Sequence, residues 1–481
     1  MTRINTNVPA LTAQAHLGRA NGDLNATLQR LSSGLRIIRG ADDPAGLIAS
    51  ETLRSEMSSI SQAIDNTQRA SNVIATAEGA LAEVAALLVN IKELTVEAAN
   101  EGALSREEIE ANQLQVDSAI DSITRIANAT TFAGQPLLNG NLAYVTSGVD
   151  STKVKALDIY GAQLGSQAYL DVAVSGVSAA ERGYLEYQGN SVTGGNVTIE
   201  VASNRGVEVF NFVSGTTDDN IVAAINAVSD ATGVTSTILS DGGGTLSGVI
   251  FRSADYGSDA FVSVRALPSS GTTFTVKDAG GTTTQRDIGS DITVTVNGAS
   301  TVGTGSEIIL NTTSLDMKLK LDATFGAGSS TSFAVTGGGA MFQIGPHINF
   351  AEQVSVGIKS VIASRLGSIE NGFLNEIATG GSASLVGGNT SSASDIIEEC
   401  IEQISVLRGR LGAFECNTLD TNINSLQITL ENVTASESAI RDADFAVETS
   451  NLTRSQILVN VGTSVLALAN QTPQSVLALL Q

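Results

Sequence analysis

Residues 73–92 read VIATAEGALAEVAALLVNIK, and this stretch decides the fold. Apolar residues recur in it at steps of three and four: Ile74, Ala77, Leu81, Val84, Leu88 and Ile91. Such steps place side chains along one face of an α-helix, as in a coiled coil. Because no proline occurs between Pro44 and Pro136, we expect one long helix, with Asp43 as its cap and Pro44 in its first turn. Ser105 and Glu108 have capping-box spacing and predict a second helix that runs back along the first.

Similar stripes occur toward both chain ends. In the N-terminal part the steps of four and three join Leu24, Leu28, Leu31, Leu35 and Ile38. They predict a helix that ends near Gly40, with Arg36 and Arg39 in its last turn. In the C-terminal part the same steps join Ile397, Cys400, Ile404, Leu407, Leu411 and Phe414, and resume at Leu426, Leu430, Val433 and Ile440. Both ends therefore contribute to one helical bundle, in which Cys400 is a small core residue.

The middle of the chain has a different composition, since 29 of the 48 glycines lie between residues 141 and 345. Apolar and polar residues alternate over 197–201, 292–296 and 317–321, which predicts half-buried strands. Asn297-Gly298 is a favoured hairpin turn, and residues 217–233 predict one short helix. The fold class is thus a multidomain α plus β protein: a long-helix, coiled-coil bundle core formed by both chain termini, with a mostly β, Gly-rich insert of one or two domains.

Composition excludes several classes of function. The 26 Lys and Arg against 49 Asp and Glu give a net charge of −23, which disfavours nucleic acid and anionic membranes as partners. The two histidines, His16 and His347, and the two cysteines form no H-E-x-x-H motif and no zinc-binding cluster. We therefore expect no catalytic residues, no metal and no cofactor. The sequence has no unbroken apolar run of the roughly 18 residues that a membrane span needs. Its first residues also lack the apolar core of a cleaved signal peptide.

Both extremities lack charge. Residues 4–18 carry none apart from His16, and none of the 27 residues after Arg454 is charged. The tail is nevertheless patterned, with Leu458, Val461, Val465 and Leu468 at helical steps. Because solvated helices keep charges and interface cores lose them, we expect this stripe and the stripe from Leu24 to Ile38 to pack between subunits of a polymer. The alternative is that the tails pack on their own bundle. On the polymer reading, residues 1–40 and 450–481 become ordered on assembly.

Several segments resemble a known family. QRLSSGLRI (29–37), ADDPAG (41–46), KELTVEAAN (92–100), FAGQPLLNG (132–140) and IRDADFAVETSNLTR (440–454) are similar to the two terminal regions of bacterial flagellin. The resemblance covers about residues 1–140 and 342–481. It implies a structural subunit that assembles into the extracellular flagellar filament for motility. It also implies export through the flagellar export apparatus with an export chaperone, and contacts with cap and junction proteins.

On this basis we expect five segments. Residues 1–44 and 441–481 are the polymerisation helices, residues 45–140 and 342–440 are the two halves of the bundle domain, and residues 141–341 are the surface-exposed insert. Two alternatives remain open: the hook–filament junction protein of the same family, and a surface adhesin with a helical stalk.

The resemblance also points to an innate-immune receptor. In the family, part of the region around KELTVEAAN (92–100) contacts a vertebrate Toll-like receptor. Lys92, Glu93 and Leu94 match the family's residues at this contact. The family's nearby arginine and glutamate are replaced here by Asn90 and Gln115. These two departures weigh against recognition.

Overall fold

The computed structural model describes residues 6–100, 102–165, 167–189, 191–192, 195–239, 248–267, 274–312 and 314–478. The chain divides into two compact units. Unit 1 contains Met1–Ser71, Gln343–Glu352 and Glu415–Gln481, and unit 2 contains Asn72–Phe342 and Gln353–Phe414. Residues 1–5 and 479–481, at the outer ends of the two expected polymerisation segments, lie outside the described residues.

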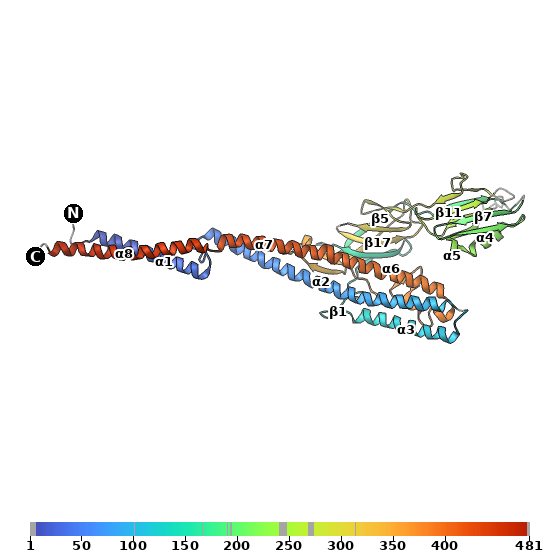
Figure 1. Ribbon diagram of the computed structural model, residues 1–481. Helices are drawn as coiled ribbons and strands as arrows, with labels where there is room; N and C mark the ends of the chain where they lie inside the picture. Colours follow the sequence, from blue (N-terminus) through green and yellow to red (C-terminus); the bar gives the residue numbers. More distant parts are fainter. Residues whose placement is uncertain are drawn as a thin grey trace. The chain divides into compact units, whose positions relative to one another are not determined.

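Unit 1 is built from long helices (Figure 1). They are α1 (Val8–Ser33), the first part of α2 (Pro44–Ala98), α7 (Thr421–Arg441) and α8 (Phe445–Ala478). The predicted start of α2 is confirmed, because Pro44 is its first residue and the Asp43 carboxylate accepts a 2.9 Å hydrogen bond from the Gly46 amide. Between α2 and α7, a small cluster contains Ile60, Ala63 and Leu426.

The predicted end of α1 near Gly40 is wrong. The helix ends at Gly34, which has φ +71° and donates its amide to the Arg30 carbonyl oxygen. Glycine adopts this left-handed conformation without a steric penalty, so Gly34 can cap the helix, whereas Gly18 and Gly22 lie within it. Leu35 and Ile38 therefore lie beyond the helix. Arg36 also has another role, because its guanidinium donates to the Ile440 carbonyl oxygen in the last turn of α7.

The two terminal helices pair with each other within the chain. α1 and α8 run antiparallel, since Asn7 contacts Ala469 at one end and Arg30 contacts Glu448 at the other (Figure 1). The face between them buries small or polar side chains: Ala13, Ala20 and Thr27 on α1, and Glu448, Ser455 and Ala469 on α8. The prediction that the ends pack mainly against other subunits is thus wrong for this one face, which has an intramolecular partner.

The helical part of unit 2 follows the predicted stripes. It contains the rest of α2, α3 (Arg106–Ala129) and α6 (Thr390–Phe414). The six residues from Ile74 to Ile91 that define the first stripe are fully buried, and α3 begins with the predicted capping box between Ser105 and Glu108. Cys400 is buried among the α6 stripe residues, as expected of a core position.

One described helix, α2, is long and apolar enough to cross a membrane. Its most apolar 18-residue window has a mean hydropathy of 1.6. A third of that window is buried inside the protein, and core helices of bundles have the same length and composition. The window is therefore weak evidence for a membrane span.

The C-terminal half of the expected bundle domain is helical only from Thr390. Before it lie η1 (Phe350–Glu352), β20 (Gln353–Val356), β21 (Gly367–Ser368), β22 (Gly372–Phe373), η2 (Leu374–Ile377) and η3 (Leu385–Gly387). A π-helical turn, Glu415–Asp420, follows α6. Two further short strands, β1 (Thr131–Phe132) and β2 (Gln135–Pro136), form a hairpin after α3.

The insert contains two β cores, consistent with the predicted one or two domains. The first core has the sheets β15-β14-β5-β18-β3 and β16-β17-β4. Its strands are β3 (Val145–Ser147), β4 (Val154–Ala162), β5 (Leu170–Ser178), β14 (Thr293–Val296), β15 (Ala299–Val302), β16 (Glu307–Asn311), β17 (Leu315–Leu321) and β18 (Ser330–Gly337). β19 (Ala340–Gln343) follows and pairs with β20.

The second core has the sheets β12-β6-β10-β9 and β13-β11-β7-β8, with α4 (Asp218–Asn226) and α5 (Ser229–Thr232). Its strands are β6 (Tyr184–Gln188), β7 (Val197–Ala202), β8 (Val207–Phe212), β9 (Val234–Ile238), β10 (Gly248–Ser253), β11 (Phe261–Ala266), β12 (Val276–Lys277) and β13 (Arg286–Ile288).

Most local predictions for the insert are confirmed. The three alternating stretches are strands β7, β14 and β17, and their apolar residues are buried. Asn297 (φ +49°) and Gly298 (φ +85°) form the turn that joins β14 to β15. The single helix predicted over 217–233 is wrong in one respect, because it is interrupted at Ala227 and Val228 and forms α4 and α5.

Candidate self-assembly surface

The candidate surface is the outer side of the α1/α8 pair. On α8 the four predicted packing residues lie at steps of three and four and remain exposed: Leu458 is 50 % exposed, Val461 52 %, Val465 48 % and Leu468 63 %. Phe445, Val447 and Ile457 on the same helix are also more than half exposed. We call the four residues Leu458, Val461, Val465 and Leu468 the outer stripe. Large apolar side chains that recur in this way on a solvent-facing helix mark an interaction surface.

The five predicted packing residues of the N-terminal stripe do not stay together. Leu24 and Leu31 are half-buried and Leu28 is exposed on α1, whereas Leu35 and Ile38 are half-buried beyond the end of the helix. Sequence reasoning missed Val8 and Leu11, which are 58 % and 59 % exposed. The signal that could have separated the two faces was the heptad repeat of small side chains at Ala13, Ala20 and Thr27, because these residues mark the face that approaches another helix closely.

The seam between α1 and α8 is narrow. Gly462 faces Leu17, and a Cβ atom added at Gly462 would lie 3.3 Å from the Leu17 Cδ1 atom. Buried or half-buried residues of α8 recur at Glu448, Leu452, Ser455, Val459, Gly462, Leu466 and Ala469. Steps of four and three are those of a coiled-coil seam, so the pair is a short antiparallel coiled coil with small residues in every second layer of α8.

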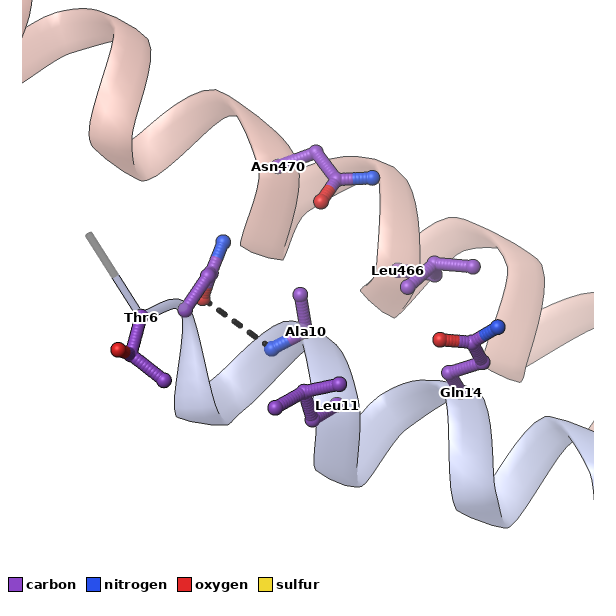
Figure 2. A pocket seen from close by; sticks show the side chains of 7 residues that line it. Thr6, Ala10, Leu11, Gln14, Leu466 and Asn470 are labelled. Carbon is purple, nitrogen blue, oxygen red and sulfur yellow. Dashed lines mark hydrogen bonds between the residues drawn. The ribbon is translucent and has the colours of Figure 1, made fainter. Parts of the chain in front are cut away.

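Two polar contacts lie near the two ends of this seam. At one end Arg30 pairs with the buried Glu448 at 3.4 Å. At the other end Asn7 caps α1 by accepting from the Ala10 amide at 3.2 Å, and its side-chain amide donates to the Ala469 carbonyl oxygen at 2.8 Å. Figure 2 shows the open groove beside Asn7, of about 470 Å³, which is also lined by Thr6, Leu11, Gln14, Leu466 and Asn470. The side chains that line the groove are amides, a hydroxyl and alkyl groups. None of them is charged, so the groove offers no charged group to bind a metal ion or a charged cofactor.

A compact connection joins the helix pair to α2 and α7. We call residues 34–44 and 442–444 the elbow. The Arg36 amide donates to the Arg441 carbonyl oxygen at 2.7 Å, and the Ala443 amide donates to the Gly34 carbonyl oxygen at 2.9 Å. Ile37 is buried in this connection, and the close approach of Gly46 to Ile37 leaves no room for a larger side chain at residue 46. The two segments that connect the helix pair to the rest of unit 1 are therefore hydrogen-bonded to each other through their backbones.

The predicted receptor residues do not form one exposed patch. Lys92 pairs with Glu398 at 2.8 Å, Glu93 is exposed, and Leu94 is buried at 9 % exposure. The structure thus presents Glu93 freely, while Leu94 belongs to the bundle core.

Among the described residues, no group of three or more His, Cys, Asp or Glu side chains could hold a metal ion. Burial raises the pKa of the Cys400 thiol far above its usual range, which makes this cysteine unreactive. The second cysteine, Cys416, is exposed on the π-helical turn.

In this chain the two ends pair as helices, expose an apolar outer stripe and flank a β insert in the sequence. These features are those of a class of self-assembling structural proteins. The comparisons with known proteins specify the class. A family model described as the bacterial flagellin N-terminal helical region matches residues 4–143, and one described as the bacterial flagellin C-terminal helical region matches residues 394–480.

Full-length relatives agree with these two matches. Flagellin B of Helicobacter pylori is 28 % identical over 100 % of this chain and 99 % of its own. The B-type flagellin of Pseudomonas aeruginosa and a flagellin of Salmonella typhimurium are each 28 % identical over 99 % of both chains. The chain belongs to the bacterial flagellin family and is a structural subunit of the flagellar filament, an extracellular appendage.

Two of the solved structures that are similar to the chain resemble it weakly. The flagellar cap protein FliD of Escherichia coli (domains D1–D3) has a TM-score of 0.30 at 13 % identity and covers 48 % of this chain and 64 % of its own. Hook-associated protein 3 of Legionella pneumophila also has a TM-score of 0.30 at 13 % identity, and covers 81 % and 98 %. Neither alternative, the junction protein or the adhesin, is supported better than the filament subunit.

Proposed function

We propose that this subunit polymerises through the outer side of its α1/α8 pair. The observation that carries the proposal is the outer stripe: four Leu and Val side chains about half exposed on a helix that has no charged residue after Arg454. A helix that stayed in water would carry charges on this face, and interface cores are depleted of them.

Burial of the outer stripe makes a favourable contribution to the free energy of association. Full burial of a Val or Leu side chain contributes about 1.5–3 kcal/mol, so four half-exposed side chains contribute roughly 4 kcal/mol per subunit. Because α1 and α8 already pair in the chain, assembly orders fewer residues than it would with separate ends. A head-to-tail contact of this kind that does not close on itself produces a helical filament.

The remaining parts of the proposal follow from this assembly. The terminal segments 1–44 and 441–481 form the shared core, the bundle segments 45–140 and 342–440 surround it, and the insert 141–341 projects from the surface. The subunit leaves the cell through the flagellar export apparatus with an export chaperone and without a cleaved signal peptide. In the filament it contacts further copies of itself and the cap and junction proteins. It has no catalytic activity, and we expect no recognition by a Toll-like receptor, because Leu94 is buried and Lys92 is paired.

Charge placed on the outer stripe tests the proposal. The variant V461D/V465D introduces two carboxylates at positions 52 % and 48 % exposed, where the folded subunit can accommodate them. We expect a soluble, folded protein that no longer elongates filament seeds, because an unpaired buried carboxylate costs several kcal/mol. The matched control is V302D on β15, a 65 % exposed valine of the insert, which should elongate seeds normally. Elongation by V461D/V465D at the unmodified rate would refute the proposed interface.

A further inference from the structure

The seam between α1 and α8 repeats every seven residues and does not by itself select one alignment. Ala13, Ala20 and Thr27 recur at this interval on α1, and Ser455, Gly462 and Ala469 recur on α8. Gly462 faces Leu17, so the small residues of one helix lie opposite larger residues of the other, and a slide of seven residues would keep this arrangement by moving Gly462 from Leu17 to Leu24 or Ala10. Coiled coils with such uniform layers need a polar or charged residue to fix one register.

Glu448 breaks this repeat. It occupies the same face of α8 as Ser455, Gly462 and Ala469, one heptad earlier, but it carries a carboxylate and is only 6 % exposed. One of its oxygens pairs with Arg30, and the other, Oε2, is buried and has no hydrogen-bond partner among the described residues. Removing the partner of such a buried charge is strongly destabilising, so alignments without Arg30 opposite Glu448 are disfavoured.

The two possible slides have different penalties. In the antiparallel pair Leu17 faces Gly462 and Arg30 faces Glu448. A slide of seven residues in one direction sets Glu448 opposite Asp23, which places two carboxylates together. The opposite slide sets Glu448 opposite Ile37, beyond the end of α1 at Ser33, where no residue of the helix faces the carboxylate.

We propose that the Arg30–Glu448 ion pair is the contact that fixes the register of the α1/α8 pair, and with it the alignment of the outer stripe. A slide of one heptad displaces α8 along α1 by about 10 Å, which is enough to move the outer stripe out of phase with its neighbours in a filament. This consequence for assembly rests on the proposed function, whereas the register itself is a property of the single chain.

The competing anchor is the elbow. Its backbone hydrogen bonds also tie the base of the pair, through Gly34, Arg36, Arg441 and Ala443. If the elbow alone set the alignment, neutralising Arg30 would leave the register unchanged. The Arg36→Gln variant, which removes the side-chain bond to the Ile440 carbonyl oxygen, is therefore the matched elbow control.

Disulfide reporters in the full-length monomer measure the register directly. In a Cys416→Ser background, which removes the exposed thiol, L17C/G462C reports the native alignment, because a Cβ atom at Gly462 lies 3.7 Å from the Leu17 Cβ atom, within disulfide range. A10C/G462C and L24C/G462C report the slides of seven residues in the two directions. The readout is the fraction of intramolecular disulfide formed in verified monomer by mild oxidation.

With Arg30 and Glu448 intact, we expect the native reporter to cross-link and the two slid reporters to stay reduced. R30Q should lower the native fraction at least threefold and raise a slid fraction, and R30K, which keeps the cation, should restore the native pattern. R30Q/E448Q removes the buried charge altogether and should populate native and slid registers together, while R36Q should leave the native fraction unchanged.

Two results would overturn the proposal. If R30Q and R30Q/E448Q both keep the native fraction while R36Q shifts it, the elbow sets the register. If all three reporters stop cross-linking in R30Q/E448Q, the ion pair stabilises the helices without selecting their alignment. Normal elongation by V461D/V465D would refute the polymerisation surface and leave the register measurement, made on monomer, untouched.

Discussion

Truncation of the outer stripe gives a graded prediction for the strength of the filament. Leu468 is 63 % exposed and Leu458 is 50 % exposed in the subunit. Taking about 2 kcal/mol for full burial of a leucine side chain, the exposed part of Leu468 contributes about 1.3 kcal/mol on assembly and that of Leu458 about 1 kcal/mol. Leu468→Ala should therefore raise the critical concentration for assembly about tenfold, and Leu458→Ala about fivefold.

The double variant L458A/L468A tests additivity as well. The two positions lie ten residues apart, about 15 Å along the helix, so their effects should add to roughly fiftyfold. The assay is the concentration of subunit left in solution at equilibrium after seeding, measured by sedimentation of the filaments. Because these side chains are largely solvated in the subunit, the free energy of unfolding of the monomer should change by less than about 0.5 kcal/mol.

Val302→Ala, at a 65 % exposed position in the insert, is the matched control and should leave the critical concentration unchanged. If L458A/L468A also leaves the critical concentration within twofold of the unmodified subunit, the outer stripe stays exposed in the filament, and burial of α8 cannot be what drives assembly.

Four further outcomes are expected. Leu81→Ala, at a fully buried position, should lower the free energy of unfolding by about 2–5 kcal/mol in urea denaturation, whereas Val89→Ala, 48 % exposed on the same helix, should change it little. In the native monomer a thiol reagent should modify Cys416 and leave the buried Cys400 unmodified until the protein unfolds. The Thr324 hydroxyl and amide together with Lys155 hold the pKa of Asp322 at about 2. This carboxylate therefore stabilises the fold above about pH 4, and its contribution is lost as the pH falls toward 2. Acid unfolding of Asp322→Asn should lack that part of the pH dependence. Excision of residues 145–340 with a short linker should still permit assembly, into filaments that are thinner by electron microscopy, because the two β cores bury their own residues.

The sequence predicted the bundle well because its signals there are local and redundant. The steps of three and four from Ile74 to Ile91, the Pro44 start and the capping box at Ser105 each report helix formation without reference to distant residues. The hairpin at Asn297-Gly298 was predictable for the same reason, since its turn conformation is a property of those two residues.

The elbow was not predictable in this way. Leu35 and Ile38 continue the spacing of the N-terminal stripe, so periodicity alone extends the helix to them. What ends α1 at Gly34 is a set of contacts with a segment more than 400 residues away: the Ala443 amide bonds to the Gly34 carbonyl oxygen, and Arg36 bonds to the end of α7. A glycine at position 34 permits the end, and a long-range partner makes it favourable.

The two faces of α8 explain which features of the chain ends could be predicted from the sequence and which could not. In a solvated coiled coil the large apolar residues lie in the seam and the small or polar ones outside. In α8 the heptad of Ser455, Gly462 and Ala469 faces α1, while Leu458, Val461, Val465 and Leu468 face outward. Hydrophobic periodicity finds the larger residues, so it identified the exposed stripe that we propose as the surface for other subunits, and it missed the small residues of the seam within the chain. Leu452, Val459 and Leu466 alternate with these small residues and add apolar area to the seam, but they also recur every seven residues and fit more than one alignment. On the register proposed above, the buried Arg30–Glu448 ion pair is the contact that selects one of them.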